Sequence, residues 1–138
     1  MVNASQRKNG ELIVLNDAQK LFDYTYQITR NNFNKTEDNF QYSQDYKWFC
    51  DEIRRICLYA VLDIRTANKK KISDSEERKE RLTLQNGVEI MYERLSGIVK
   101  IAYENQMIKN KKIKTWDKLI DDALISLRKW RKSDKERY

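Results

Sequence analysis

The residues with the clearest chemical capacity in this sequence are its lysines and arginines, whose excess over acidic residues is concentrated near the end of the chain. Residues 109–138 hold eleven cations and five anions, a net charge of +6, while the whole chain of 138 residues carries +7. Asp117, Asp121 and Asp122 form an acidic middle that separates two basic ends. Because ammonium and guanidinium groups bind phosphate oxygens, this distribution predicts contact with a polyanion.

Three basic groups are candidates for phosphate contact. The first flanks the start of the last predicted helix, where cations oppose the helix dipole, so an external anion explains them better than local stability does. The second ends the same helix, where the dipole itself favours cations, and the third lies on the second predicted helix and its end. The first group is Lys109, Lys111, Lys112 and Lys114; the second is Arg128, Lys129, Arg131 and Lys132; the third is Arg54, Arg55, Arg65, Lys69, Lys70 and Lys71.

Four tyrosines add a second kind of candidate contact. The rings of Tyr46, Tyr59, Tyr92 and Tyr103 are of the type that stacks on unpaired bases. At helical spacing, such residues more often belong to a core or an interface. Both interpretations stay open at this stage.

The sequence contains no catalytic or metal-binding constellation. Histidine is absent, which excludes Ser-His-Asp triads, Cys-His dyads and most zinc sites. Cys50 and Cys57 are two helical turns apart, about 10 Å, too far for a mutual disulfide, and we interpret both as small core residues in a reducing compartment. No glycine-rich phosphate loop is present. We therefore expect no enzymatic activity, no catalytic residue, no cofactor and no metal.

The elements that position these groups are predicted to be long helices in one domain. Proline is absent and glycine occurs three times, while hydrophobic residues make up 40% of the chain and recur at steps of three and four. Gly87 and Gly97 fall inside a predicted helix, where we expect each to mark the close approach of a neighbouring helix. The pattern favours an all-α fold, an antiparallel four-helix bundle.

The predicted boundaries follow from polar stretches and capping residues. We expect a flexible N-terminal lead at residues 1–10, the bundle at 11–133 and a charged tail at 134–138. Ser43 and Thr83 are the expected N-caps of the second and third helices. The expected helices run from about Glu11 to Asn31, from Gln44 to Lys70 and from Thr83 to Gln106, and the fourth follows a last connection from Asn105 to Lys112. The connection 32–44 holds Phe33, Phe40 and Tyr42, which we expect to pin it to the bundle.

The second helix is apolar over an unusually wide arc. Six residues extend its arc beyond one face: Trp48, Cys57, Leu58, Tyr59, Val61 and Leu62. A helix of this kind typically contacts more than its own bundle, so we expect a homo-oligomer. The alternative is the central helix of an ordinary bundle.

The sequence predicts no membrane segment. No run approaches the roughly 20 apolar residues that a spanning helix needs. The first ten residues lack the apolar core of a signal peptide, so we expect a cytoplasmic protein.

Five phrases of the sequence, taken in order, carry a resemblance to a known family. They are Leu12–Leu15, Thr66–Lys70, Thr83–Gln85, Trp116–Ile120 and Trp130–Ser133. Their order and spacing resemble the accessory variability determinant proteins of diversity-generating retroelements. That family is part of a wider group of small four-helix-bundle proteins that includes the rRNA intervening-sequence proteins.

The resemblance implies a function as well as a fold. Such proteins assemble as pentameric barrels, have no catalytic activity, and associate with a reverse transcriptase and its template RNA to support error-prone cDNA synthesis. For this chain the resemblance implies a reverse transcriptase and RNA, or an RNA/DNA hybrid, as partners of a homopentamer.

Two alternatives to this function stay open. Where family members tend to carry small residues, this chain has Arg128 and Lys129, which leaves open an accessory subunit of a different reverse-transcriptase system. The other alternative is an oligomeric scaffold that binds an acidic protein partner.

Overall fold

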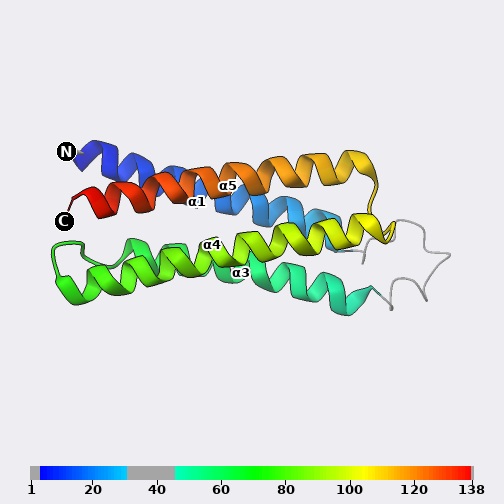
Figure 1. Cartoon of the computed structure of the whole chain (residues 1–138), viewed down its shortest axis with the longest axis horizontal. Helices are drawn as coiled ribbons and strands as arrows, with labels where there is room; N and C mark the ends of the chain where they lie inside the picture. Colours follow the sequence, from blue (N-terminus) through cyan, green and yellow to red (C-terminus); the bar gives the residue numbers. More distant parts are fainter. Residues whose placement is uncertain (1–3, 31–45, 138) are drawn as a thin grey trace.

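The computed structural model describes residues 4–30 and 46–137, with side chains in the first range from residue 9 onward. Within these ranges the chain forms four α-helices and no β-strand: α1 (Ala4–Thr29), α3 (Lys47–Asn68), α4 (Ser75–Glu104) and α5 (Asn110–Glu136). Successive helices run in opposite directions, so the start of α1 and the end of α5 lie at the same end of the bundle (Figure 1). The predicted antiparallel four-helix bundle is confirmed.

The helices are arranged as a square. Helices α1 and α4 each pack against both α3 and α5. One diagonal therefore joins α1 to α4 and the other joins α3 to α5. This order places the basic helix α5 beside α1 and α4, and leaves the outer face of α3 on the opposite side.

The boundaries of three helices differ from the predicted ones. Helix α1 already includes residues 4–10, which the sequence predicts to be a flexible lead. A single glycine at position 10 costs a helix only about 1 kcal/mol, which is too little to stop it among good helix formers. Helix α5 begins at Asn110, inside the connection expected at 105–112. It runs to Glu136 and buries Asp134, so most of the expected charged tail at 134–138 is part of the bundle.

The third difference lies at the start of α4. Asp74 is its N-cap, because one side-chain oxygen accepts hydrogen bonds from the backbone N–H groups of Glu76 and Glu77 at 2.9 and 3.2 Å. An aspartate cap satisfies the free N–H groups of a first turn as well as the expected Thr83 would, and it comes first in the chain. The stretch 75–82 is therefore helical. The predicted connection 32–44, with Ser43, Phe33, Phe40 and Tyr42, lies outside the described residues.

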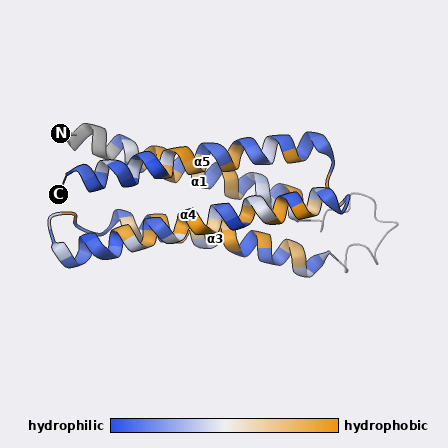
Figure 2. Ribbon diagram, viewed as in Figure 1, coloured by the Kyte–Doolittle hydropathy of each residue, from blue (hydrophilic) through white to orange (hydrophobic). Residues whose placement is uncertain are grey.

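Steps of three and four along α5 predict one inward stripe, and the core confirms it. All six members are buried: Ile113, Trp116, Ile120, Ala123, Leu127 and Trp130. The same spacing predicts an inward stripe on α3, of which only Ile56 is partly exposed: Phe49, Ile53, Ile56, Ala60, Ile64 and Ala67. On α4 it also predicts that Tyr103 faces inward, which is wrong, because the buried row passes through Val99 and Ala102 and leaves the Tyr103 ring 41% exposed. Hydrophobic residues gather along the middle of the bundle, whereas the ends of α5 are hydrophilic (Figure 2).

The two glycines of α4 do not mark close helix approach, contrary to the expectation. A methyl group added at Gly87 or Gly97 would meet no atom within 4 Å. Both lie away from the buried row of the helix. Their conformational freedom therefore destabilises α4 without a packing benefit.

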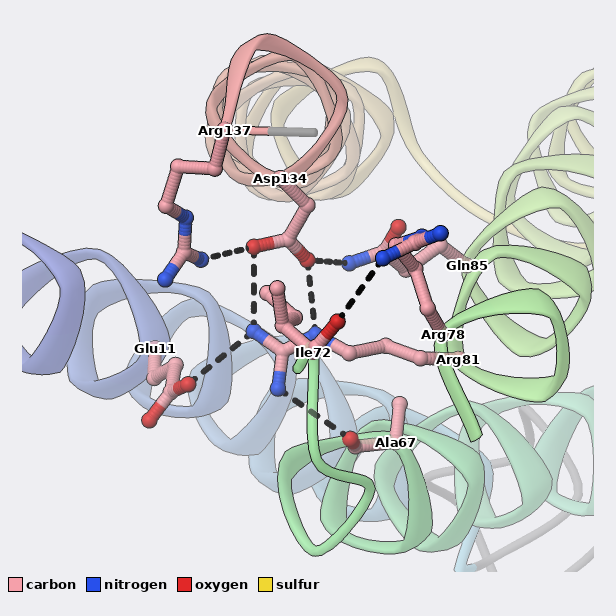
Figure 3. A network of polar contacts seen from close by, with 8 residues as sticks. All are labelled: Glu11, Ala67, Ile72, Arg78, Arg81, Gln85, Asp134 and Arg137. Atoms are coloured by element: carbon pink, nitrogen blue, oxygen red, sulfur yellow. Dashed lines mark hydrogen bonds and ion pairs between the residues drawn. The ribbon is translucent and has the colours of Figure 1, made fainter. Parts of the chain in front are cut away.

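A buried ion pair ties all four helices together near the chain ends (Figure 3). The Arg81 Nε and Nη2 atoms of α4 donate to the two carboxylate oxygens of Asp134 on α5 at 2.7 and 3.2 Å. The same guanidinium donates to the carbonyl of Ala67 on α3 at 3.3 Å and to Glu11 on α1 at 3.0 Å. Its carbon lies 4.9 Å from the centre of the Trp130 ring, a cation–π contact. Arg81 is 2% exposed and Asp134 1%, so neither charge is solvated by water.

Nearer the other end of the bundle, a neutral polar contact also joins several helices. Thr25, fully buried on α1, accepts a hydrogen bond from the Trp116 indole N–H at 2.9 Å. The Cys57 thiol contacts the same hydroxyl at 3.4 Å. Because α1 contributes the acceptor and α5 and α3 the donors, this threonine fixes how three helices are set against one another.

The buried ion pair gives a first prediction. Asp134→Ala should lower the free energy of unfolding by about 3–5 kcal/mol, because it leaves the Arg81 guanidinium buried with only part of its carboxylate partners. The double variant Arg81→Met/Asp134→Leu should be less destabilised than Asp134→Ala, since it removes both charges and fills their volume. Urea unfolding followed by circular dichroism measures both changes against the unchanged protein. Lys135→Ala, at an exposed neighbouring position, should change stability by less than about 0.5 kcal/mol.

Candidate nucleic-acid interface

The first basic group lies at the turn between α4 and α5. The chain leaves α4 through Gln106, which has a positive φ of 61°, and Lys109 then precedes α5 in an extended conformation. No side chain caps this helix start, and its first turn has no acidic residue. The N–H groups of the first turn and the positive end of the helix dipole are therefore directed toward the same end of the bundle as these lysines.

The lysines of this group differ in their surroundings. Lys109, Lys111 and Lys114 are exposed, and within the described ranges none of the three makes an ion pair. Lys112 is partly buried, and its carbonyl accepts a hydrogen bond from the Tyr24 hydroxyl at 3.3 Å. Three of the four predicted residues thus carry exposed ammonium groups with no ion-pair partner among the described residues.

The second basic group is largely engaged within the bundle. Glu89 on α4 accepts from Arg128 Nε at 2.7 Å and from Arg131 Nη2 at 3.0 Å, and Arg131 also donates to the Asn86 side chain. These hydrogen bonds, that from Arg131 first, hold the pKa of Glu89 below its usual 4.5. The structure therefore gives Arg128 and Arg131 a structural task, clamping α5 to α4.

The two lysines of the second group remain on the surface. Lys129 is exposed and has no carboxylate partner among the described residues. Lys132 lies 3.9 Å from Glu136, a distance at which two exposed charges contribute little to stability.

The third group is divided in the same way. Arg54 donates to the carbonyl of Thr29 at 2.6 Å and also binds Asp51, so it ties α3 to the end of α1. Arg55 pairs with Glu52 at 3.0 Å, and Lys70 pairs with Glu80 at 2.7 Å. The remaining members are exposed and make no ion pair with a described residue: Arg65, Lys69 and Lys71.

The structure separates the predicted residues rather than joining them into one patch. The lysines at the start of α5 lie at one end of the bundle, where the α4–α5 turn is (Figure 1). Lys69 and Lys71 follow the end of α3, at the opposite end, where Arg81 brings Ala67 and Asp134 together. Two unpaired basic regions therefore lie at the two ends of a helical rod.

The aromatic candidates are also divided. Tyr92 is 1% exposed, which excludes it from stacking on a base, and burial raises the pKa of its hydroxyl. Tyr59 and Tyr103 are exposed, Tyr59 beside Leu58 and near Leu62 on the outer face of α3. Leu58, Tyr59 and Leu62 form an exposed apolar face on α3. Of the predicted wide arc, the bundle buries Cys57 and Val61 and leaves this face and Trp48 uncovered.

The remaining chemical groups are placed as follows. Cys50 and Cys57 are buried, as predicted, and burial raises the pKa of each thiol to about 12. Among the described residues, no three acidic or cysteine side chains gather in a way that would hold a metal ion. None of the described helices has an apolar stretch long enough to cross a bilayer.

Sequence reasoning missed two acidic anchors, Glu89 and Asp134. The available signal was position: by helical spacing, Glu89 and Asp134 lie on the sides of their helices that face a neighbouring helix. Their partners on the neighbouring helix, Arg128 for Glu89 and Arg81 for Asp134, lie more than 35 residues away in the sequence, which no local pattern reveals.

Comparison with known proteins identifies no relative: no family model matches the chain, and no curated protein or solved structure is significantly similar to it.

The Glu89 clamp gives a second prediction. Because the pKa of Glu89 is lowered in the folded protein, its stabilising effect is fully present above its ordinary pKa of 4.5 and is lost as pH falls through the lower folded value. Glu89→Gln should therefore lower the free energy of unfolding at pH 7, and the difference from the unchanged protein should shrink steadily below pH 4.5. Urea unfolding between pH 7 and pH 3 measures this difference. In the control Glu93→Gln, which removes a carboxylate 3.7 Å from Arg128 and 58% exposed, the pH-dependent difference should be much smaller.

Proposed function

We propose that this chain is a non-catalytic nucleic-acid-binding accessory protein that works with a reverse transcriptase and its template RNA in the cytosol. The resemblance to accessory variability determinant proteins supports this proposal and gives it a task, the error-prone cDNA synthesis of a diversity-generating retroelement. The four-helix bundle is compatible with that family. The proposal rests on the resemblance for the enzyme partner, and on the basic surface for the nucleic acid.

One observation carries the nucleic-acid part of the proposal. Lys109, Lys111 and Lys114 are exposed and lack carboxylate partners among the described residues, at an uncapped helix start. Three unpaired ammonium groups beside a positive helix end repel one another and raise the energy of the free protein. A phosphate group relieves this repulsion and accepts hydrogen bonds from the same region.

The mode of binding follows from the chemistry of these side chains. Lysines on flexible stems contact phosphates and carry no base code, so recognition is largely independent of sequence. Each phosphate that a lysine neutralises releases a condensed counterion, which makes the affinity fall steeply with salt.

A closed homo-oligomer, a pentamer according to the resemblance, completes the proposal. Leu58 and Leu62 are 42% and 46% exposed on α3, and the neighbouring Tyr59 is 49% exposed. Burying such a face against another copy stabilises an assembly by the hydrophobic effect. Rotational symmetry would then repeat the basic ends around the ring, so that weak phosphate contacts add up to useful avidity.

The nucleic-acid surface gives a third prediction. A single-stranded RNA should bind with an affinity that depends strongly on salt. Replacing Lys109, Lys111 and Lys114 together by Gln should reduce the magnitude of the log–log salt slope by about 2 to 3, because each phosphate that a lysine neutralises contributes ~0.7–0.9 to that slope. Fluorescence anisotropy with a labelled RNA at several salt concentrations measures the slope.

The matched control removes the same charge elsewhere. Lys20, Lys79 and Lys135 are exposed on α1, α4 and the far end of α5 and belong to none of the three basic groups. Their joint replacement by Gln should change the slope by much less. If the first variant folds and keeps the original slope, the basic surface serves an acidic protein partner instead, and the scaffold alternative replaces this proposal.

The oligomer gives a fourth prediction. Light scattering at micromolar concentration should return about five times the 16.7 kDa of one chain. Leu62→Glu places a charge on the exposed apolar face of α3 and should shift the mass toward a monomer without loss of helix. Ile90→Glu, at an exposed position of α4, should leave the mass unchanged. A monomer mass for the unchanged protein would contradict the assembly.

A further inference from the structure

A groove of about 480 Å³ lies between α1 and α5, near the end of the bundle where α1 starts and α5 ends. Its walls come from one row of residues on each helix. Small residues create the space: Gly10 on α1 and Ser126 and Ser133 on α5. A methyl group added at Gly10 would meet no atom within 4 Å, so the glycine leaves open volume rather than permitting close packing.

The middle of the groove is apolar. Ile13 and Ile125 line it from opposite helices and are 44% and 51% exposed. Two large aliphatic side chains facing a common open space in water lose the free energy that burial would give them. An apolar group between them would recover part of that free energy.

Two hydrogen-bond donors in the groove wall have no acceptor among the described residues. The indole nitrogen of Trp130 and the Nε atom of Arg137 are buried, and neither donates a hydrogen bond to a residue that the structure describes. The Trp130 residue is 3% exposed and the Arg137 side chain 8%. Buried donors are nearly always paired in proteins, so two unpaired ones beside one groove indicate a missing acceptor. Both atoms are covered, so an acceptor would reach them after a small shift of the side chains above them.

The charges of the groove are ordered along its length. Lys129 lies on the side of the chain ends and has no carboxylate partner among the described residues; Arg137 lies beside it, and its Nη2 atom pairs with Asp134. Asp17 and Asp122 lie toward the middle of the bundle. From Asp122 to Lys129 the helix rises about 10 Å. The cationic end attracts one negative charge, and the two carboxylates at the other end disfavour a second.

We propose that this groove binds a small amphiphilic monocarboxylate, a carboxylate group on a short aliphatic chain. The carboxylate lies against Lys129 and accepts hydrogen bonds from the Trp130 indole and Arg137, where donors and positive charge coincide. The aliphatic chain lies between Ile13 and Ile125. This site is separate from the lysines at the start of α5, so it holds or fails independently of the proposed nucleic-acid binding.

Octanoate is a suitable probe, with octylamine and octanol as partners of matched chain length. In a titration of the full chain followed by ¹H–¹⁵N NMR, octanoate should shift the Trp130 indole signal in a saturable way. The indole signals of Trp48 and Trp116, which do not line the groove, should stay in place. Octanol and octylamine should bind at least tenfold more weakly, because neither offers a negatively charged acceptor.

Two pairs of variants test the charge and the space. Lys129→Glu should weaken octanoate binding at least tenfold, while Lys135→Glu, the same charge change outside the groove, should not. Gly10→Leu fills the open volume with a better helix former and should abolish binding, while Gly97→Leu on the exposed side of α4 should not. Equal binding of octylamine, unchanged binding in folded Lys129→Glu or Gly10→Leu, or no saturable shift of the Trp130 signal would overturn the proposal.

Discussion

The bidentate contact between Arg81 and Asp134 is the constraint on which the arrangement of the helices most depends. Apolar stripes drive the helices to pack together. They do not by themselves prevent one helix from sliding or rotating against another, because hydrophobic attraction has no direction. A buried guanidinium that must meet a carboxylate on α5, a carbonyl on α3 and a carboxylate on α1 tolerates neither. The Thr25 hydroxyl applies the same kind of constraint further along the rod, through Trp116.

The bundle also decides which cations are free to act. Glu89 binds both arginines near the end of α5, and Asp51 binds Arg54, so these guanidiniums join helices. Lys111, at the start of α5, has no such partner among the described residues. A count of lysines and arginines treats all of them alike, whereas the structure divides them into cations that join helices and cations that are exposed and free to bind an anion.

Periodic features were predictable and distant pairings were not. The stripe from Ile113 to Trp130 follows from spacing alone, because every helical residue has a fixed angular position. The sequence predicts that Arg81 belongs to a solvated, charged connection, because no nearby residue indicates that Asp134 lies beside it in space. For the candidate site, the sequence located all the basic residues but did not separate Arg131, held by Glu89, from Lys129, which has no carboxylate partner in the part of the chain that the structure describes. That distinction depends on which face of α4 packs against α5.

Because α5 is one continuous helix, the distances between its lysines are fixed. Eighteen residues make five full turns, so Lys111 lies directly above Lys129, and Lys114 above Lys132, each pair about 27 Å apart along the axis. In a flexible basic tail the distance between two charged groups varies, so such a tail does not favour any particular spacing of phosphates. The nine buried residues of α5 fix its position in the bundle, so its two sets of ammonium groups stand at a single fixed interval.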